Sequence, residues 1–176
     1  MRLTLLVILS VFVATGLFAF EAGTINPGGG FSSSSYKADS DSDALTSFTL
    51  YPSIGLFVID NLSADFLLTC LDQKQGSSEY SRMNIGIGGR FYVTKFYGGL
   101  GVLYNSWKSG SFESSRYFFQ LSGGYMIPVT EQVHIDLGAK YLLGFGKYGK
   151  DYSHIDNEGK ELQINAGIQV FIPTRK

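Results

Sequence analysis

The chain has 176 residues, a formal net charge of −1, 16% charged residues and 15% aromatic residues. This length predicts one domain, and the near-neutral charge excludes a surface built to bind nucleic acid. The aromatic content excludes a disordered chain, and the single cysteine, Cys70, excludes an internal disulfide.

The chain begins with the three parts of a secretory signal peptide. Arg2 forms a minimal positive region, Leu3 to Ala14 form an apolar stretch, and Leu17-Phe18-Ala19 offers a cleavage site. The alternative, a retained membrane helix, would be at the short limit for a span, and no positive cluster follows it. We therefore expect residues 1–19 to be removed and residues 20–176 to form one mature domain.

The mature part repeats a pattern of alternating apolar and polar residues followed by a turn, which is typical of antiparallel strands. Residues 22–36 show it most weakly, since they are rich in Gly and Ser, with Ile25, Phe31 and Tyr36 as apolar anchors. The pattern predicts eight strands in all, at 22–36, 45–58, 62–74, 83–93, 96–107, 114–127, 133–145 and 162–172.

The two faces of these strands differ in chemistry. In the last strand, apolar residues from Leu162 to Ile172 share one face, whereas Gln163, Asn165 and Gln169 lie on the other, together with Phe171. Apolar residues toward lipid and small or polar residues toward a narrow lumen are typical of transmembrane barrels. A secreted lipocalin-like carrier has the reverse arrangement and is an open alternative. In a membrane the sheet must close, because unpaired backbone groups are costly in hydrocarbon.

The connections alternate in length. Short turns are predicted at 59–61, 94–95 and 128–132, and longer polar links at 39–43, 73–79, 108–115 and 147–159. Short turns on one side and longer loops on the other are the arrangement of outer-membrane barrels. The predicted fold is therefore an all-β, eight-stranded antiparallel up-and-down transmembrane β-barrel. Aromatic residues near strand ends are expected to form two interfacial girdles, namely Phe57, Phe91, Phe96, Tyr97, Tyr104, Trp107, Tyr117, Phe145 and Tyr148.

The segment Pro52-Ser53-Ile54-Gly55-Leu56-Phe57-Val58-Ile59-Asp60-Asn61-Leu62 resembles a P-S-x-G-x-F-x-x-D-N-L hairpin. This hairpin is common in the small outer-membrane β-barrel family, which includes OmpA-like and OmpW-like barrels. The segment Gln169-Val170-Phe171-Ile172 is similar to the family's C-terminal assembly signal, although Pro173-Thr174-Arg175-Lys176 follows it. The resemblance implies a bacterial outer-membrane location, contact with outer-membrane lipids and insertion by the β-barrel assembly machinery through the C-terminal strand. We also expect a monomer.

Four charged residues fall on the predicted lumen face: Asp65, Arg90, Asp136 and Lys140. An eight-stranded barrel is just wide enough for side chains to fill it, so charges buried there must pair. Asp65 and Arg90 lie on adjacent strands at similar distances from a short turn, which makes them a plausible pair. The favoured interpretation is a structural ion-pair core. The alternative is a gate whose ion pairs exchange to open a narrow water path, so that substituting Arg90 would change the conductance.

No catalytic residue, metal or cofactor is predicted. The Ser153-His154-Ile155-Asp156 cluster has hydrolytic residue types, but neighbours in one loop rarely form a triad. Two histidines, including His134, and one cysteine give no zinc spacing, and Gly86 to Gly89 lack the third glycine of a dinucleotide fingerprint. The acidic run Asp39 to Asp43 lacks the glycine and glutamate of a calcium loop. The open function classes are a structural, adhesive or narrow-pore barrel, a lipid-modifying outer-membrane enzyme, and the lipocalin-like carrier.

Overall fold

The computed structural model describes residues 20–36, 45–76, 78–110, 112–147 and 159–174. Among these residues there is no helix of the length and hydropathy needed to cross a membrane. The predicted signal peptide, the acidic run and the cluster around His154 lie outside the described residues. The strands are β1 (Ile25–Gly29), β2 (Phe31–Tyr36), β3 (Leu45–Leu50), β4 (Ser53–Ile59), β5 (Leu62–Gln75), β6 (Ser78–Val93), β7 (Phe96–Ser109), β8 (Phe112–Pro128), β9 (Val133–Phe145) and β10 (Lys160–Val170).

The ten strand segments make eight spans, because the first two predicted strands are each interrupted. Gly30 separates β1 from β2, and Tyr51 and Pro52 separate β3 from β4. Proline lacks the N–H that a ladder requires. Gly29 has a φ of 146°, which residues with a side chain rarely adopt. Both interruptions therefore fall where the residues disfavour a regular ladder.

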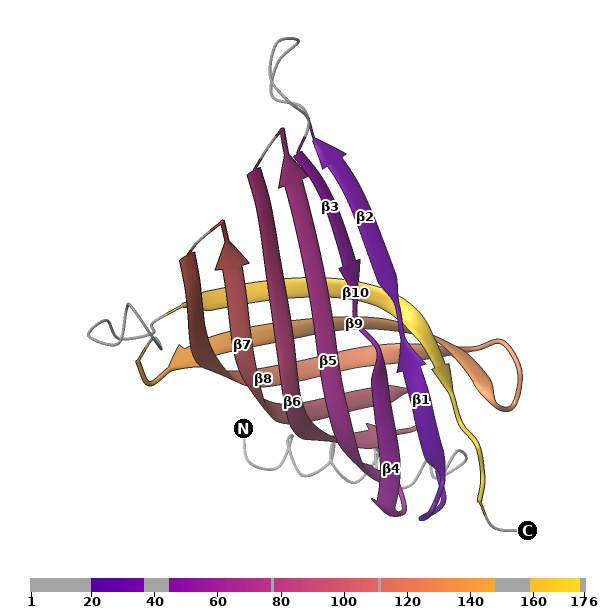
Figure 1. The fold of residues 1–176 in the computed structure, drawn as a ribbon. Coiled ribbons are helices and arrows are strands. Elements are labelled where there is room, and N and C mark those ends of the chain that lie inside the picture. Colours follow the sequence, from indigo (N-terminus) through magenta and orange to yellow (C-terminus); the bar gives the residue numbers. More distant parts are fainter. Residues whose placement is uncertain (1–19, 37–44, 77, 111, 148–158, 175–176) are drawn as a thin grey trace, which may run out of the picture.

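The spans close into a ring. From β4 to β10 each strand pairs antiparallel with the next, and β1 pairs with both β4 and β10 (Figure 1). An isolated bridge from Ile25 to Ile172 adds to the closure between β1 and the chain end. The predicted eight-stranded antiparallel barrel is therefore confirmed, with short turns at 60–61, 94–95 and 129–132.

Two of the predicted long links are wrong. Within the segments 73–79 and 108–115, two residues separate β5 from β6, and two residues separate β7 from β8. Gly76 and Gly110 adopt positive φ values of 57° and 58°, which suit tight hairpin turns. The polar residues there continue the ladders instead of leaving them. A ladder above the bilayer meets water on both faces, so apolar alternation no longer marks where a strand ends.

Large apolar side chains cover the outside of the barrel. Ile164 is 85% exposed, and Phe66, Ile87, Leu100 and Ile135 are also exposed. Small and polar residues alternate with them and face the lumen. A belt of exposed apolar side chains around a barrel is a surface for lipid. The orientation is therefore the one predicted for a membrane barrel and opposite to that of a lipocalin-like carrier.

Some of the predicted girdle aromatics do lie on the outer surface. The Phe96 ring lies 4.8 Å from the Tyr125 ring near the short turns, and the Tyr104 ring lies 5.5 Å from the Tyr117 ring farther along. Phe57 and Tyr97 were expected in the girdle but are buried in the lumen. Trp107 shares the lumen face of β7, and Tyr148 lies outside the described residues.

Candidate functional site

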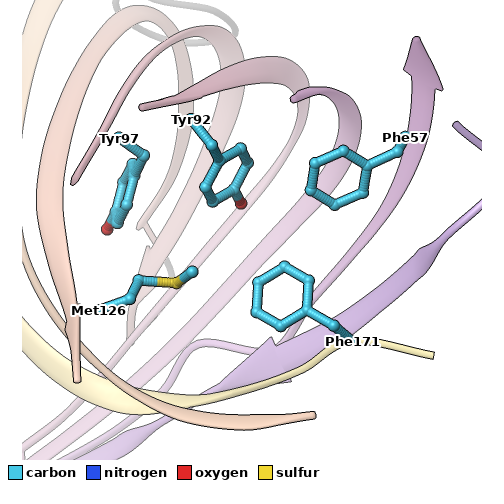
Figure 2. Packing of buried hydrophobic residues seen from close by; sticks show 5 residues of the cluster. All are labelled: Phe57, Tyr92, Tyr97, Met126 and Phe171. Carbon is cyan, nitrogen blue, oxygen red and sulfur yellow. The ribbon is translucent and has the colours of Figure 1, made fainter. Parts of the chain in front are cut away.

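Aromatic rings fill the end of the lumen beside the short turns (Figure 2). The buried side chains of this inner plug come from five parts of the chain and are Phe57, Tyr92, Tyr97, Met126 and Phe171. The ring of Phe20 covers them and stacks on Phe171 with 4.1 Å between centroids. Gly124 and Gly138 leave room for Tyr97, since a Cβ at either position would lie 2.6 Å from its side chain.

His134 belongs to the wall of this plug. Its ring meets the ring of Phe171 edge-on at 5.1 Å, and the residue is buried. Among the described residues, no group of three or more His, Cys, Asp or Glu side chains is placed to hold a metal ion. His134 therefore contributes its ring to the packing of the inner plug.

A buried ion pair lies directly above the inner plug. Arg90 donates from Nε and Nη2 to the two carboxylate oxygens of Asp65, at 2.8 and 3.0 Å. The Asp65 side chain is 1% exposed and also accepts a hydrogen bond from Ser63 Oγ at 3.0 Å. The guanidinium lies 5.7 and 5.6 Å from the ring centroids of Tyr92 and Tyr97. The structure thus brings the expected pair together, in two-point geometry.

The other two candidate charges have different partners. Asp136 accepts hydrogen bonds from Tyr97 Oη at 2.9 Å and from Gln169 Nε2 at 3.1 Å. The Lys140 ammonium lies 5.4 Å from the centroid of the Tyr51 ring. No carboxylate among the described residues forms an ion pair with Lys140. Asp136 is therefore tied to the Asp65–Arg90 layer through Tyr97, whereas Lys140 has no paired anion among the residues that the structure describes.

A second apolar cluster crosses the lumen farther out. This outer plug consists of the buried Leu103, Phe118 and Leu142, with Leu67 packed against them. Between the two plugs lies a polar chamber of about 40 Å³. Because a water molecule needs roughly 10–15 Å³ of such volume, the chamber holds only a few waters. The side-chain oxygens of Asn165 and Gln169 are buried and have no hydrogen-bond partner within the described ranges. Buried polar atoms of this kind are usually satisfied by water.

Sequence reasoning missed a second ion pair nearer the outer end. Arg82 donates from Nη1 and Nη2 to the two carboxylate oxygens of Glu161, both at 2.9 Å, and joins β6 to β10 across the lumen. Gln163 Nε2 donates to the same carboxylate at 2.8 Å. The sequence could have predicted the lumen position of Arg82. Arg82 and Arg90 lie an even number of positions apart along one strand, so their side chains lie on the same face. The predicted strand began one residue later, so Arg82 was left out.

Comparison with solved structures identifies the fold. The crystal structure of Neisserial surface protein A aligns with a TM-score of 0.53 at 17% identity, covering 87% of this chain and 98% of that chain. The crystal structure of the outer membrane protein OprG from Pseudomonas aeruginosa aligns with a TM-score of 0.51 at 14% identity, covering 86% and 94%. No protein-family model and no curated protein matches the chain. The chain has the fold of small outer-membrane β-barrels, and the OmpA-like or OmpW-like assignment stays a prediction.

Proposed function

We propose that this protein is a monomeric barrel of the bacterial outer membrane whose lumen does not conduct, and which has a structural and adhesive role. The observation that carries the proposal is the filling of the lumen. Rings close the inner end, the Asp65–Arg90 layer lies above them, and Leu103, Phe118 and Leu142 close the chamber on the outer side. A lumen filled in this way supports a barrel that holds its shape more than one that passes solutes.

The outer hairpins support the adhesive part of the role. β5–β6 and β7–β8 continue past the apolar belt as polar ladders. Lys74 and Glu79 form a 3.3 Å ion pair across the first hairpin, with side chains 65% and 75% exposed. Asp72 and Lys108 are also exposed there. Charged, exposed ladders above the bilayer offer a surface to a partner outside the cell.

The remaining parts of the proposal come from the sequence. Residues 1–19 are removed after export, and the β-barrel assembly machinery recognises the C-terminal strand together with the segment up to Ile172. The mature barrel contacts outer-membrane lipids and has no enzymatic activity. The alternative of a lipid-modifying enzyme depends on the cluster around His154, which lies outside the described residues.

Recording in planar bilayers tests the closed lumen. We expect the purified barrel to give no steady conductance, and an open porin inserted in the same way serves as the positive control. Arg90→Met is expected to stay silent as well, because both plugs remain in place when the ion pair is lost. Reproducible openings of the unmodified barrel, altered by Arg90→Met, would contradict the proposal and favour the gate.

A further inference from the structure

The barrel wall has an open seam. β1 pairs with β10 at two positions, Gly28 with Gln169 and Gly29 with Ile168. β2 continues the same span but pairs with β3 alone. Within the described chain, residues 160–167 of β10 pair with β9 and have no strand on their other side. Figure 1 shows β2 continuing upward from β1 while β10 (yellow) crosses behind it and runs away.

Tyr51 occupies the base of this seam. Its hydroxyl donates a hydrogen bond to the backbone carbonyl of Ala166 on the open edge of β10. The side chain passes over Gly30, where a Cβ would lie 2.6 Å from the Tyr51 hydroxyl. Tyr51 thus crosses the first span and takes a β10 acceptor that a neighbouring strand would otherwise use. The seam is therefore built from specific residues: Gly30 leaves space for the Tyr51 side chain, and the Tyr51 hydroxyl reaches the open edge of β10.

The base of the seam, beside Phe31, lies at the depth of the hydrocarbon. On β10 the outward side chains beside it include Leu162 and Ile164, and on β2 the outward Phe31 is 70% exposed. Unpaired backbone N–H and C=O groups at this depth are costly unless something polar reaches them. The open edge of β10 therefore favours an occupant that brings polar atoms to the seam and apolar atoms to the lipid-facing side.

The polar chamber reaches the same seam. Gly29, Tyr51 and Gly167 line it on the seam side, and Lys140 lines it from within. The Tyr51 ring links the two places, since its hydroxyl lies on the β10 edge and its centroid is 5.4 Å from the Lys140 ammonium. The Lys140 ammonium, which has no ion-pair partner in the described part of the chain, therefore lies beside the side chain at the base of the opening.

We propose that the seam binds a single-chain amphiphile with a carboxylate headgroup. The carboxylate enters beside Tyr51 and accepts hydrogen bonds from the Lys140 ammonium, while the hydrocarbon chain lies over Phe31 and Ile164 outside the barrel. The chamber size favours this head, because about 40 Å³ admits a group of a few heavy atoms and not a bulky phospholipid headgroup. Asp136 accepts hydrogen bonds from Tyr97 and Gln169. It forms no ion pair with Lys140 in the described part of the chain.

Electron spin resonance of labelled lipids tests the site in the full barrel. The barrel is reconstituted in phosphatidylcholine vesicles at pH 9, where a fatty acid is ionised, with spin-labelled stearic acid, its methyl ester or phosphatidic acid. We expect stearate to be immobilised about tenfold more strongly than the methyl ester, because a charge-assisted hydrogen bond is lost with the charge. Equal immobilisation of acid and ester would overturn the proposal.

Two lysine variants test whether the preference for stearate depends on Lys140. Lys140→Met removes the chamber cation and is expected to abolish the preference for stearate, whereas Lys74→Met in the exposed hairpin leaves it unchanged. A preference that survives Lys140→Met would overturn the site. A phosphatidic acid preference as strong as that of stearate and equally lost with Lys140 would overturn the single-chain carboxylate and indicate a phospholipid headgroup.

Discussion

Replacing Arg90 with methionine is expected to lower the free energy of unfolding by about 3–5 kcal/mol, because it leaves the Asp65 carboxylate buried without its cation. Asp65 would keep only the hydrogen bond from Ser63. Methionine retains an apolar stem between the rings of Tyr92 and Tyr97, so the loss reports mainly on the charge. Urea unfolding in lipid vesicles, followed by the fluorescence of the single tryptophan, Trp107, measures it.

Two comparisons separate the buried pair from ion pairs in general. Lys74→Met breaks the exposed pair with Glu79 and should cost no more than about 1 kcal/mol. The double variant Asp65→Asn/Arg90→Met should recover part of the loss, because no unpaired charge is left behind. If Arg90→Met lowers the free energy of unfolding by no more than Lys74→Met, the Asp65–Arg90 pair is not a buried ion pair.

Phe57→Ala is the second substitution with a large expected effect. Phe57 is 1% exposed and contacts Phe20, Tyr92 and Phe171 in the inner plug. Removing a buried phenyl ring costs about 3–5 kcal/mol, because it combines lost burial with a cavity that relaxes only in part. The same urea titration measures the change.

The matched control for the plug is Phe66→Ala. Phe66 lies on the next strand, but its side chain points to lipid and is 44% exposed. Lipid chains fill the space that the ring leaves, so the cost should be clearly smaller than for Phe57→Ala. Equal costs for the two variants would mean that Phe57 does not pack in a closed plug.

Alternation along the strands predicted most of the fold. Ile87 and Arg90 are three residues apart, so alternation puts their side chains on opposite faces of the strand. The structure places Ile87 toward lipid and Arg90 in the lumen. The same rule assigned Asp65 to the lumen. Because Asp65 and Arg90 were predicted to lie on neighbouring strands, they were expected to be within reach of each other. Both inferences depend only on the period of two that every strand imposes. They needed no knowledge of barrel tilt or shear.

The parts that were missed depend on the closed barrel as a whole. Arg82 and Glu161 lie on β6 and β10, on opposite sides of the lumen, and which residues meet there is set by shear. Phe57 was assigned to the girdle because it lies near a strand end. Alternation would have put it on the lumen face, since it is two residues from Gly55. Pro52 lies within the predicted strand 45–58, and neither the break there nor the reach of Tyr51 across to β10 was predicted.

Cell fractionation with a heat-shift gel tests the central claim, an antiparallel β-barrel that spans the outer membrane. The protein should be found in the outer-membrane fraction, and its band should move on the gel when the sample is boiled, because unboiled antiparallel barrels resist detergent unfolding. Recovery in the soluble periplasm, or a band that boiling does not move, would contradict the account.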